Sequence, residues 1–151
     1  MELSRPLDRK MERRYNSIMT FFEKIKPYSP ILVRYGIGLV FLLMGLDQLI
    51  HADWWTSYFP TNLPFNIPVV SAVFYNGIFD LSIGILLIVG FLTRVISIVA
   101  SLHLVSIIYY LGYNDISIRD IGILLATISI FAQGPDQLCL DQKIFKSAQN
   151  Q

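Results

Sequence analysis

The chain has 151 residues, of which 54% are hydrophobic and only 15% are charged. A soluble domain of this length has too little interior to bury so many apolar side chains, so the composition excludes an ordinary soluble protein and indicates a membrane protein. The formal net charge of +1 conceals an uneven distribution of basic residues, and we expect no nucleic-acid partner.

Residues 1–30 form a basic segment that precedes the apolar stretches. Seven of the twelve Lys and Arg residues lie here, and apolar residues recur between them every three or four positions: Leu3, Leu7, Met11, Tyr15, Ile18, Phe22 and Ile25. This spacing predicts an amphipathic helix that either lies on an anionic membrane surface or packs on the cytoplasmic end of a helical bundle. The segment lacks the apolar core of a secretory signal, so we expect it to remain on the protein.

Four apolar stretches follow, at about residues 31–50, 68–91, 95–113 and 116–133. Each approaches the roughly 20 residues with which a helix crosses a hydrocarbon core about 30 Å thick. Short turns separate the second from the third and the third from the fourth, and no stretch shows the period-two alternation of a barrel strand. We therefore expect an all-α membrane protein: an antiparallel bundle of four transmembrane helices over residues 31–142, an amphipathic cytoplasmic helix before it and a tail at 143–151.

Glycines two helical turns apart predict where two of these helices approach each other. Gly38 and Gly45 share one face of the first stretch, and Gly77 and Gly84 share one face of the second.

The basic residues predict the orientation of the bundle. Residues 51–67 contain no Lys or Arg, whereas Arg94 lies in the second turn and Lys143 and Lys146 follow the fourth stretch. With the basic N-terminal segment, this asymmetry places both termini in the cytoplasm by the positive-inside rule.

Two ionisable residues lie near the middle of apolar stretches, Asp80 in the second and His103 in the third. A charged Asp at the bilayer centre costs about 2.5–3.5 kcal/mol, whereas one interhelical hydrogen bond returns roughly 0.6–2 kcal/mol. Asp80 is therefore either protonated or paired with a cation, and His103 is at a similar depth on the adjacent helix. Three alternatives stay open: a hydrogen bond that locks the two helices, a pair that handles protons, or no contact.

Further polar residues gather at the outer membrane edge. Arg119 stands one turn into the fourth stretch, where the helix dipole disfavours a cation, so it needs an acidic partner such as Asp115 or Asp47. Asp120, by contrast, suits this position. The arrangement predicts either an interfacial ion-pair clamp or a polar socket for an anionic or carbonyl-bearing ligand.

The loop of residues 51–68 is rich in aromatic residues and prolines. It is either an aromatic belt at the headgroup level or a lid over an apolar pocket. The candidate ligand-binding residues of the outer edge and this loop are Asp47, His51, Trp54, Trp55, Arg119 and Asp120.

The sequence argues against several kinds of cofactor site and against a disulfide. His51 and His103 differ in depth, so a haem held within one chain is not expected. The sequence shows no metal-ligand cluster, phosphate-binding glycine loop or dinucleotide fingerprint, so we expect no metal site and no covalent cofactor. The single cysteine, Cys139, leaves no intrachain disulfide.

Three segments together resemble the DoxX-like family of small four-helix membrane proteins: LVRYGIGLVFLLMGLDQL, GFLTRVISIVAS and IRDIGILLATISIFAQGPDQLCLD. The resemblance covers about residues 31–142. It implies a bundle in a prokaryotic cytoplasmic membrane and a link to redox complexes, because the family takes its name from a terminal quinol oxidase subunit and a related branch contributes to thiosulfate:quinone oxidoreduction. By position, the family pattern falls on Arg34, Gly38, Gly45, Gly84, Thr93, Arg94, Arg119, Asp120, Gly134, Pro135 and Asp141, none of which is an established catalytic residue. Gln48 stands where many relatives carry a lysine.

Two functional hypotheses follow. The first is a membrane subunit associated with a quinone- or quinol-linked redox complex, which binds a quinone-like lipid near the outer leaflet and is at most a non-catalytic or quinone-binding subunit. The second is a non-catalytic membrane adapter or small-solute permease whose polar layers only hold the bundle together. The expected partners are membrane lipid and either redox-complex subunits or further copies of the chain.

Overall fold

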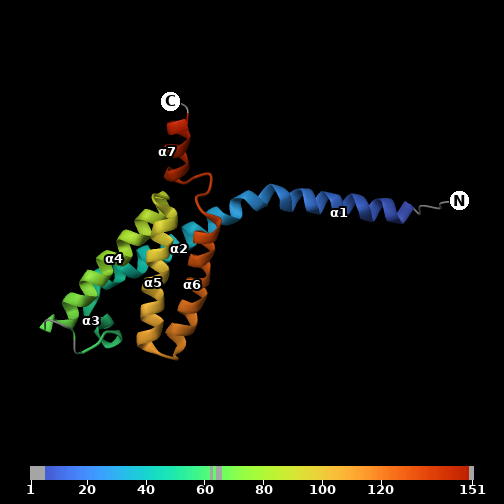
Figure 1. Ribbon diagram of the computed structural model, residues 1–151. Helices are drawn as coiled ribbons and strands as arrows, with labels where there is room; N and C mark the ends of the chain where they lie inside the picture. The colour runs from blue at the N-terminus through green and yellow to red at the C-terminus, as the bar shows by residue number, and fades with distance from the viewer. Residues whose placement is uncertain (1–5, 62, 64–65, 150–151) are drawn as a thin grey trace.

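The computed structural model describes residues 6–61, 63 and 66–149, and within this range the side chains of residues 10–144. The elements are α1 (Pro6–Ile25), η1 (Lys26–Tyr28), α2 (Ser29–Ile50), α3 (Ala52–Trp55), η2 (Thr56–Tyr58), α4 (Val69–Val89), α5 (Thr93–Leu111), α6 (Asp115–Gln133) and α7 (Leu140–Gln149). The described part of the chain is thus all-helical and contains no strand, as the sequence predicts (Figure 1).

Within the described ranges, three helices are long and apolar enough to cross a membrane: the continuous run Lys10–Ile50, which includes α2, then α4 and α5. α6 has 19 residues and packs beside α5 (Figure 1). Its first two turns carry Asp115, Arg119 and Asp120. The chain is therefore a membrane protein. Its described part has three candidate membrane spans and a fourth, more polar helix, α6, that packs against them.

α2 and α4 form the closest helix pair because glycine removes the side chains between them. A Cβ atom on Gly45 would lie 2.4 Å from the backbone nitrogen of Leu81, and one on Gly84 would lie 2.5 Å from that of Leu42. The two backbones therefore touch directly, as the glycine spacing predicts. By contrast, a Cβ on Gly36 or Gly122 would meet nothing within 4 Å.

The two ends of the bundle differ, and we name them by their residues. The clamp end comprises residues 90–94 and 134–141, and the pocket end comprises α3, η2 and residues 112–114. The helix pair α2–α4 diverges from the pair α5–α6 toward the pocket end (Figure 1). The buried apolar cluster draws on all four of these helices and consists of Ile37, Phe41, Ile83, Leu87, Ala100, Leu104 and Ile130.

The turns between helices follow from local chemistry. α4 ends at Gly90, whose φ of 71° is left-handed and suits a helix C-terminus. Leu92, with φ 49°, holds the same conformation before α5. At the pocket end, the side chain of Asn114 caps α6 by accepting a hydrogen bond from the backbone nitrogen of Ser117 at 2.9 Å.

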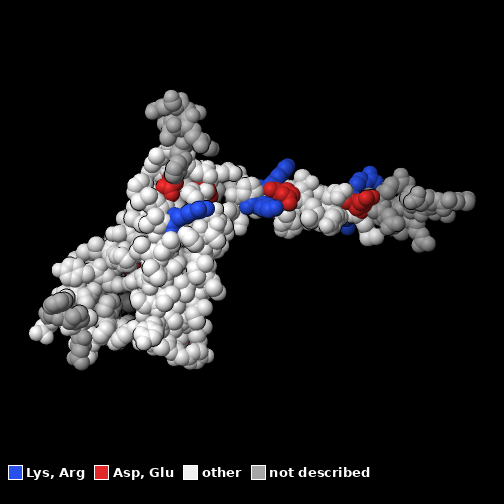
Figure 2. Space-filling view, viewed as in Figure 1, with Lys and Arg blue, Asp and Glu red and all other residues white. Residues whose placement is uncertain are grey.

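α1 leaves the bundle at the clamp end and runs crosswise to α5 and α6 (Figure 1). Pro27 in η1 and Pro30 in the first turn of α2 sit where a missing backbone donor is tolerated. The described side chains of α1, from residue 10 onward, are all exposed, so α1 does not pack on the bundle in this structure. Figure 2 shows charge along α1 and at the clamp end, while the rest of the visible bundle is almost free of it.

Candidate functional site

A cavity of about 540 Å³ lies between the two helix pairs at the pocket end. All four long helices of the bundle line it, and residues of α3, η2 and the following loop complete the wall. Its apolar lining consists largely of Val40, Phe41, Met44, Leu104, Ile107, Leu111, Ile116 and Ile123. The volume and the apolar wall are those of a site for a small organic molecule.

Four polar side chains from three helices meet on one side of this cavity. Gln48 Nε2 donates to Asp80 Oδ2 at 3.1 Å, and Asn76 Nδ2 donates to the same oxygen at 3.0 Å. Asn76 Nδ2 also lies 2.8 Å from Gln48 Oε1. His103 Nε2 lies 3.0 Å from the other oxygen of Asp80, Oδ1. All four residues line the cavity, so Asp80 is the centre of a polar floor.

The contact between Asp80 and His103 is close but not aligned as a hydrogen bond. Their side chains are only 6% and 14% exposed. Asp80 Oδ1 and His103 Nε2 nevertheless have no hydrogen-bond partner among the described atoms. Buried polar atoms are almost always satisfied in folded proteins. The two imperfectly satisfied atoms lie beside each other in the wall of the cavity, where each is nearly inaccessible.

Arg119 and Asp120 also line the cavity, at the start of α6. Arg119 Nε donates to Asp120 Oδ1 at 2.9 Å, with Asp120 nearly buried and Arg119 half-exposed. The partner of Arg119 is thus the adjacent residue, and no ion pair between Arg119 and Asp115 or Asp47 is found in the described part. Because this bond uses only Nε, the two terminal nitrogens of the guanidinium have donors to offer to the cavity.

Aromatic residues of α3 and η2 cover the cavity, and Asp47 holds them in place. Trp55 lines the cavity, and its indole nitrogen donates to Asp47 Oδ2 at 2.8 Å. The other oxygen of Asp47 lies 2.8 Å from His51 Nδ1. Trp54 stacks on the His51 ring, with a centroid separation of 4.3 Å. We call residues 55–60 the aromatic lid; Asp47 and His51 position it from behind.

The sequence-predicted ligand residues therefore divide into two groups. Trp55, Arg119 and Asp120 line the cavity. Asp47, His51 and Trp54 do not line it but support the lid from outside. A ligand role for all six stays a prediction. Sequence reasoning missed Asn76, although its position one helical turn before Asp80 is a usable signal.

At the clamp end, Arg34 caps the C-terminus of α4 although it belongs to α2. Its guanidinium donates to the carbonyl oxygens of Leu87 at 2.5 Å and Ile88 at 2.8 Å. These carbonyls belong to the last turn of a helix, where intrahelical donors run out and a cation is favoured. Arg34 also donates twice to Asp136, at 2.6 and 3.1 Å. This pair is almost fully buried, with the side chains 1% and 4% exposed.

The opposite charge caps the next helix. Asp141 accepts hydrogen bonds from the backbone nitrogens of Leu92 at 2.7 Å and Thr93 at 2.8 Å, at the N-terminus of α5. Cys139 fills the space beside Gly90, where a Cβ atom would lie 2.7 Å from its Cα. Burial raises the pKa of the Cys139 thiol, so it is a packed rather than a reactive cysteine.

The contacts at the clamp end give several residues of the sequence motifs a structural role. Residues 134–141 connect the ends of α2, α4 and α5 through two carboxylates. Gly134, with φ 75°, leaves room for the guanidinium of Arg94, which a Cβ atom would approach to 2.8 Å. None of these residues lines the cavity. Among the described side chains, no group of three or more His, Cys, Asp and Glu is placed to hold a metal ion.

Comparison with known proteins agrees with the predicted resemblance. The comparisons found no matching curated protein and no matching solved structure. The model of the DoxX family matches residues 29–112, which include α2, the aromatic lid, α4 and α5. This match covers more than half of the chain, and it includes the residues of the cavity floor. The chain belongs to the DoxX family.

Proposed function

We propose that this DoxX-family membrane protein binds a quinone-like lipid in the cavity at the pocket end and serves as a membrane subunit of a redox complex. The observation that carries the proposal is an apolar cavity of about 540 Å³ whose lining includes both the polar cluster around Asp80 and the half-exposed Arg119. A quinone offers a flat apolar ring with polar oxygens at two opposite edges. An apolar cavity lined by two separate polar groups, one around Asp80 and one at Arg119, suits that distribution.

The proposed topology has α6 as a fourth span, with both termini in the cytoplasm of a prokaryotic cell. At about 1.5 Å per residue, the 19 residues of α6 reach about 28 Å, close to the thickness of a hydrocarbon core. The charges near its start are at the pocket end, and Asp120 is buried against the bundle rather than facing lipid. The basic residues of α1 and Arg94 gather at the clamp end, which supports that end as the cytoplasmic one. The cavity then opens toward the outer leaflet.

Each group of side chains has a distinct role in the proposal. A bound quinone supplies electron and proton acceptance. The terminal nitrogens of Arg119 donate to one ring oxygen, and Asp120 fixes the guanidinium through Nε. His103 and Asp80 hold a proton beside the other side of the ring, and Gln48 and Asn76 orient the carboxylate from Oδ2. The aromatic lid excludes water.

The alternative is an adapter or permease in which the polar floor only locks the helices together. The two readings differ in what the purified protein retains. We would extract the full-length protein in a lipid-like medium and measure bound quinone by mass spectrometry, together with thermal stability. Trp55→Ala and Arg119→Lys should lower retention at least tenfold, because each loses a contact that a ligand of this size needs.

Adjacent tryptophans provide a matched control. Trp54 is 72% exposed and lies outside the cavity, so Trp54→Ala should lower retention less than Trp55→Ala. A parent protein without quinone, or equal losses of retention and stability in all three variants, would favour the adapter.

A further inference from the structure

We propose that α1 is a surface anchor that lies on an anionic lipid bilayer at the clamp end, with its apolar face in the lipid. α1 precedes residue 29, where the DoxX match begins, so family membership does not account for it. The proposal also stands independently of any ligand in the cavity.

The first step is the unpartnered apolar face. The large apolar side chains that recur along one side of α1 are all exposed: Met11, Tyr15, Ile18, Phe22 and Ile25. An exposed contiguous apolar stripe marks an interaction surface, and no bundle residue covers this one in the described structure. Something outside the chain therefore covers it.

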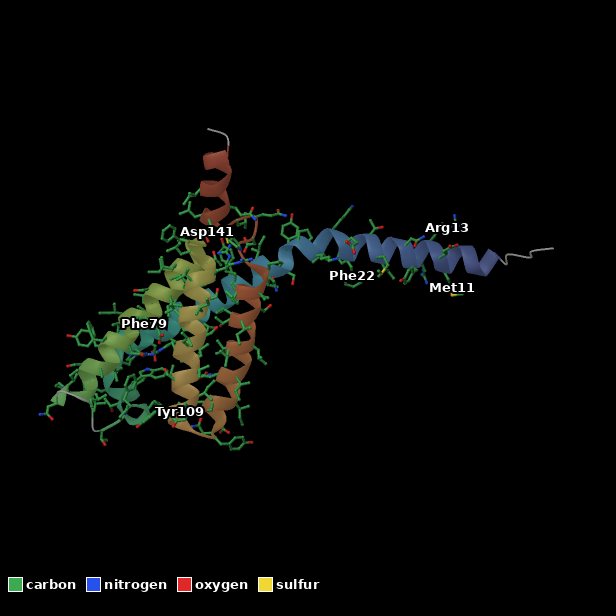
Figure 3. All side chains as sticks on the ribbon, in the orientation of Figure 1. Met11, Arg13, Phe22, Phe79, Tyr109 and Asp141 are labelled. Carbon is green, nitrogen blue, oxygen red and sulfur yellow. The ribbon has the colours of Figure 1, made fainter. Side chains whose placement is uncertain are left out.

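The second step is the direction of that face. Figure 3 shows Met11 and Phe22 pointing to the side toward which the bundle extends, and Arg13 pointing to the opposite side. α1 continues through η1 into α2, which is apolar enough to cross the membrane, so the end of α1 is held at the membrane boundary. A helix in that position that runs crosswise to the spans presents Met11 and Phe22 to the lipid and Arg13 to water.

The third step is charge. The described side chains of residues 10–26 include five basic and two acidic groups. Arg14 is three residues from Met11 and four from Ile18, so it borders the apolar stripe, and Lys10 lies one turn before Arg14 on the same side. Arg13 and Lys24, eleven residues apart, share the opposite side of the helix. An excess of basic groups at the edge of an apolar stripe complements anionic lipid headgroups. The same excess repels a second copy of α1, so a bilayer is the occupant that the charges favour.

Depth measurements on the full-length protein test the position of the face. Cys139 is replaced by Ala, and single nitroxide labels are attached at Met11→Cys, Phe22→Cys or Arg13→Cys. The protein is reconstituted in vesicles of phosphatidylcholine mixed with phosphatidylglycerol. Labels at 11 and 22 should collide mainly with oxygen, which concentrates in lipid, and the label at 13 mainly with a water-soluble nickel chelate. Three labels that all favour nickel, or labels at 11 and 22 that neither reagent reaches because protein covers them, would overturn the proposal.

A second measurement tests the choice of anionic lipid. Energy transfer from a fluorophore at Ser17→Cys, in the same Cys139→Ala background, to labelled phosphatidylglycerol or labelled phosphatidylcholine reports which lipid gathers at α1. The double variant Lys10→Gln, Arg14→Gln should lower the preference for phosphatidylglycerol by roughly fivefold for each lost charge at low salt. The matched control Glu12→Gln, Glu23→Gln should not lower it. An unchanged preference in the variant that lacks Lys10 and Arg14 would overturn the proposal.

Discussion

Removal of the Arg34 guanidinium should open the clamp end of the bundle. The side chains of Arg34 and Asp136 are 1% and 4% exposed, so water screens their attraction little. Loss of one partner from a buried pair costs about 3–5 kcal/mol, because the other charge stays buried without compensation. In Arg34→Met the carbonyl oxygens of Leu87 and Ile88 lose their donor as well. We therefore expect the free energy of opening to fall by at least about 3 kcal/mol.

The single cysteine of the chain provides the assay. Cys139 is fully buried within the clamp, so a thiol reagent reaches it only when the clamp opens. When opening and closing are fast relative to labelling, the labelling rate follows the population of the open state. A loss of about 3 kcal/mol then accelerates labelling of Arg34→Met roughly 150-fold over the parent protein.

Two variants make the result specific. Lys26→Met removes an exposed basic residue near the same end of the bundle and should leave the rate unchanged. The double variant Arg34→Met, Asp136→Leu leaves no buried charge and should restore much of the protection. Labelling of Arg34→Met at the parent rate, or a double variant as reactive as the single one, would refute the reasoning.

Four further outcomes are expected. Burial raises the pKa of Asp136, but the hydrogen bonds from Arg34 and the Leu138 backbone and the positive charge of Arg34 together outweigh burial and lower the pKa below the ordinary value; its stabilising effect is therefore complete above the unfolded-state pKa of about 3.9 and lost as the pH falls below it. Protection of Cys139 from dithiodipyridine, normalised to the unfolded chain at each pH, should accordingly decline only below about pH 4, and a loss near neutral pH would contradict this. Gly45→Ala should lower the thermal midpoint because its Cβ meets the backbone of α4, whereas Gly36→Ala, which meets nothing within 4 Å, should raise it slightly; equal shifts would refute the close approach. Asp80→Asn should fold normally and Asp80→Leu should lower the thermal midpoint, because Leu removes the acceptor of Gln48 Nε2 and one of the two acceptors of Asn76 Nδ2; equal stability of the two would show that the polar floor is dispensable. Because Cys139 is buried, topology is better tested at the exposed site Lys143→Cys in a Cys139→Ala background, where an impermeant thiol reagent should react only after cells are permeabilised.

The apolar composition and the lengths of the apolar stretches were sufficient to predict that this is a membrane protein and where its long helices lie. The apolar stretches predicted α2, α4, α5 and α6 to within two residues at every end. Glycines two turns apart marked the close approach of α2 and α4, since backbones can come this close only where side chains are absent. Matching depth on adjacent helices pointed to Asp80 and His103, which lie 3.0 Å apart. These features are local or nearest-neighbour properties, which a sequence records directly.

The sequence could not assign partners across long separations in the chain. Arg34 and Asp136 are 102 residues apart, and only the packing of the chain brings this arginine to the end of α4 and to that carboxylate. Equally, the sequence did not separate Trp55 from Trp54, because neighbours in a short helix point in different directions and only the tertiary structure decides which one faces the cavity. The sequence by itself determined that this is a helical membrane protein with polar residues at defined depths. The tertiary structure decided which of them close the clamp and which face the cavity, because a side chain's role depends on its direction and on neighbours supplied by distant segments.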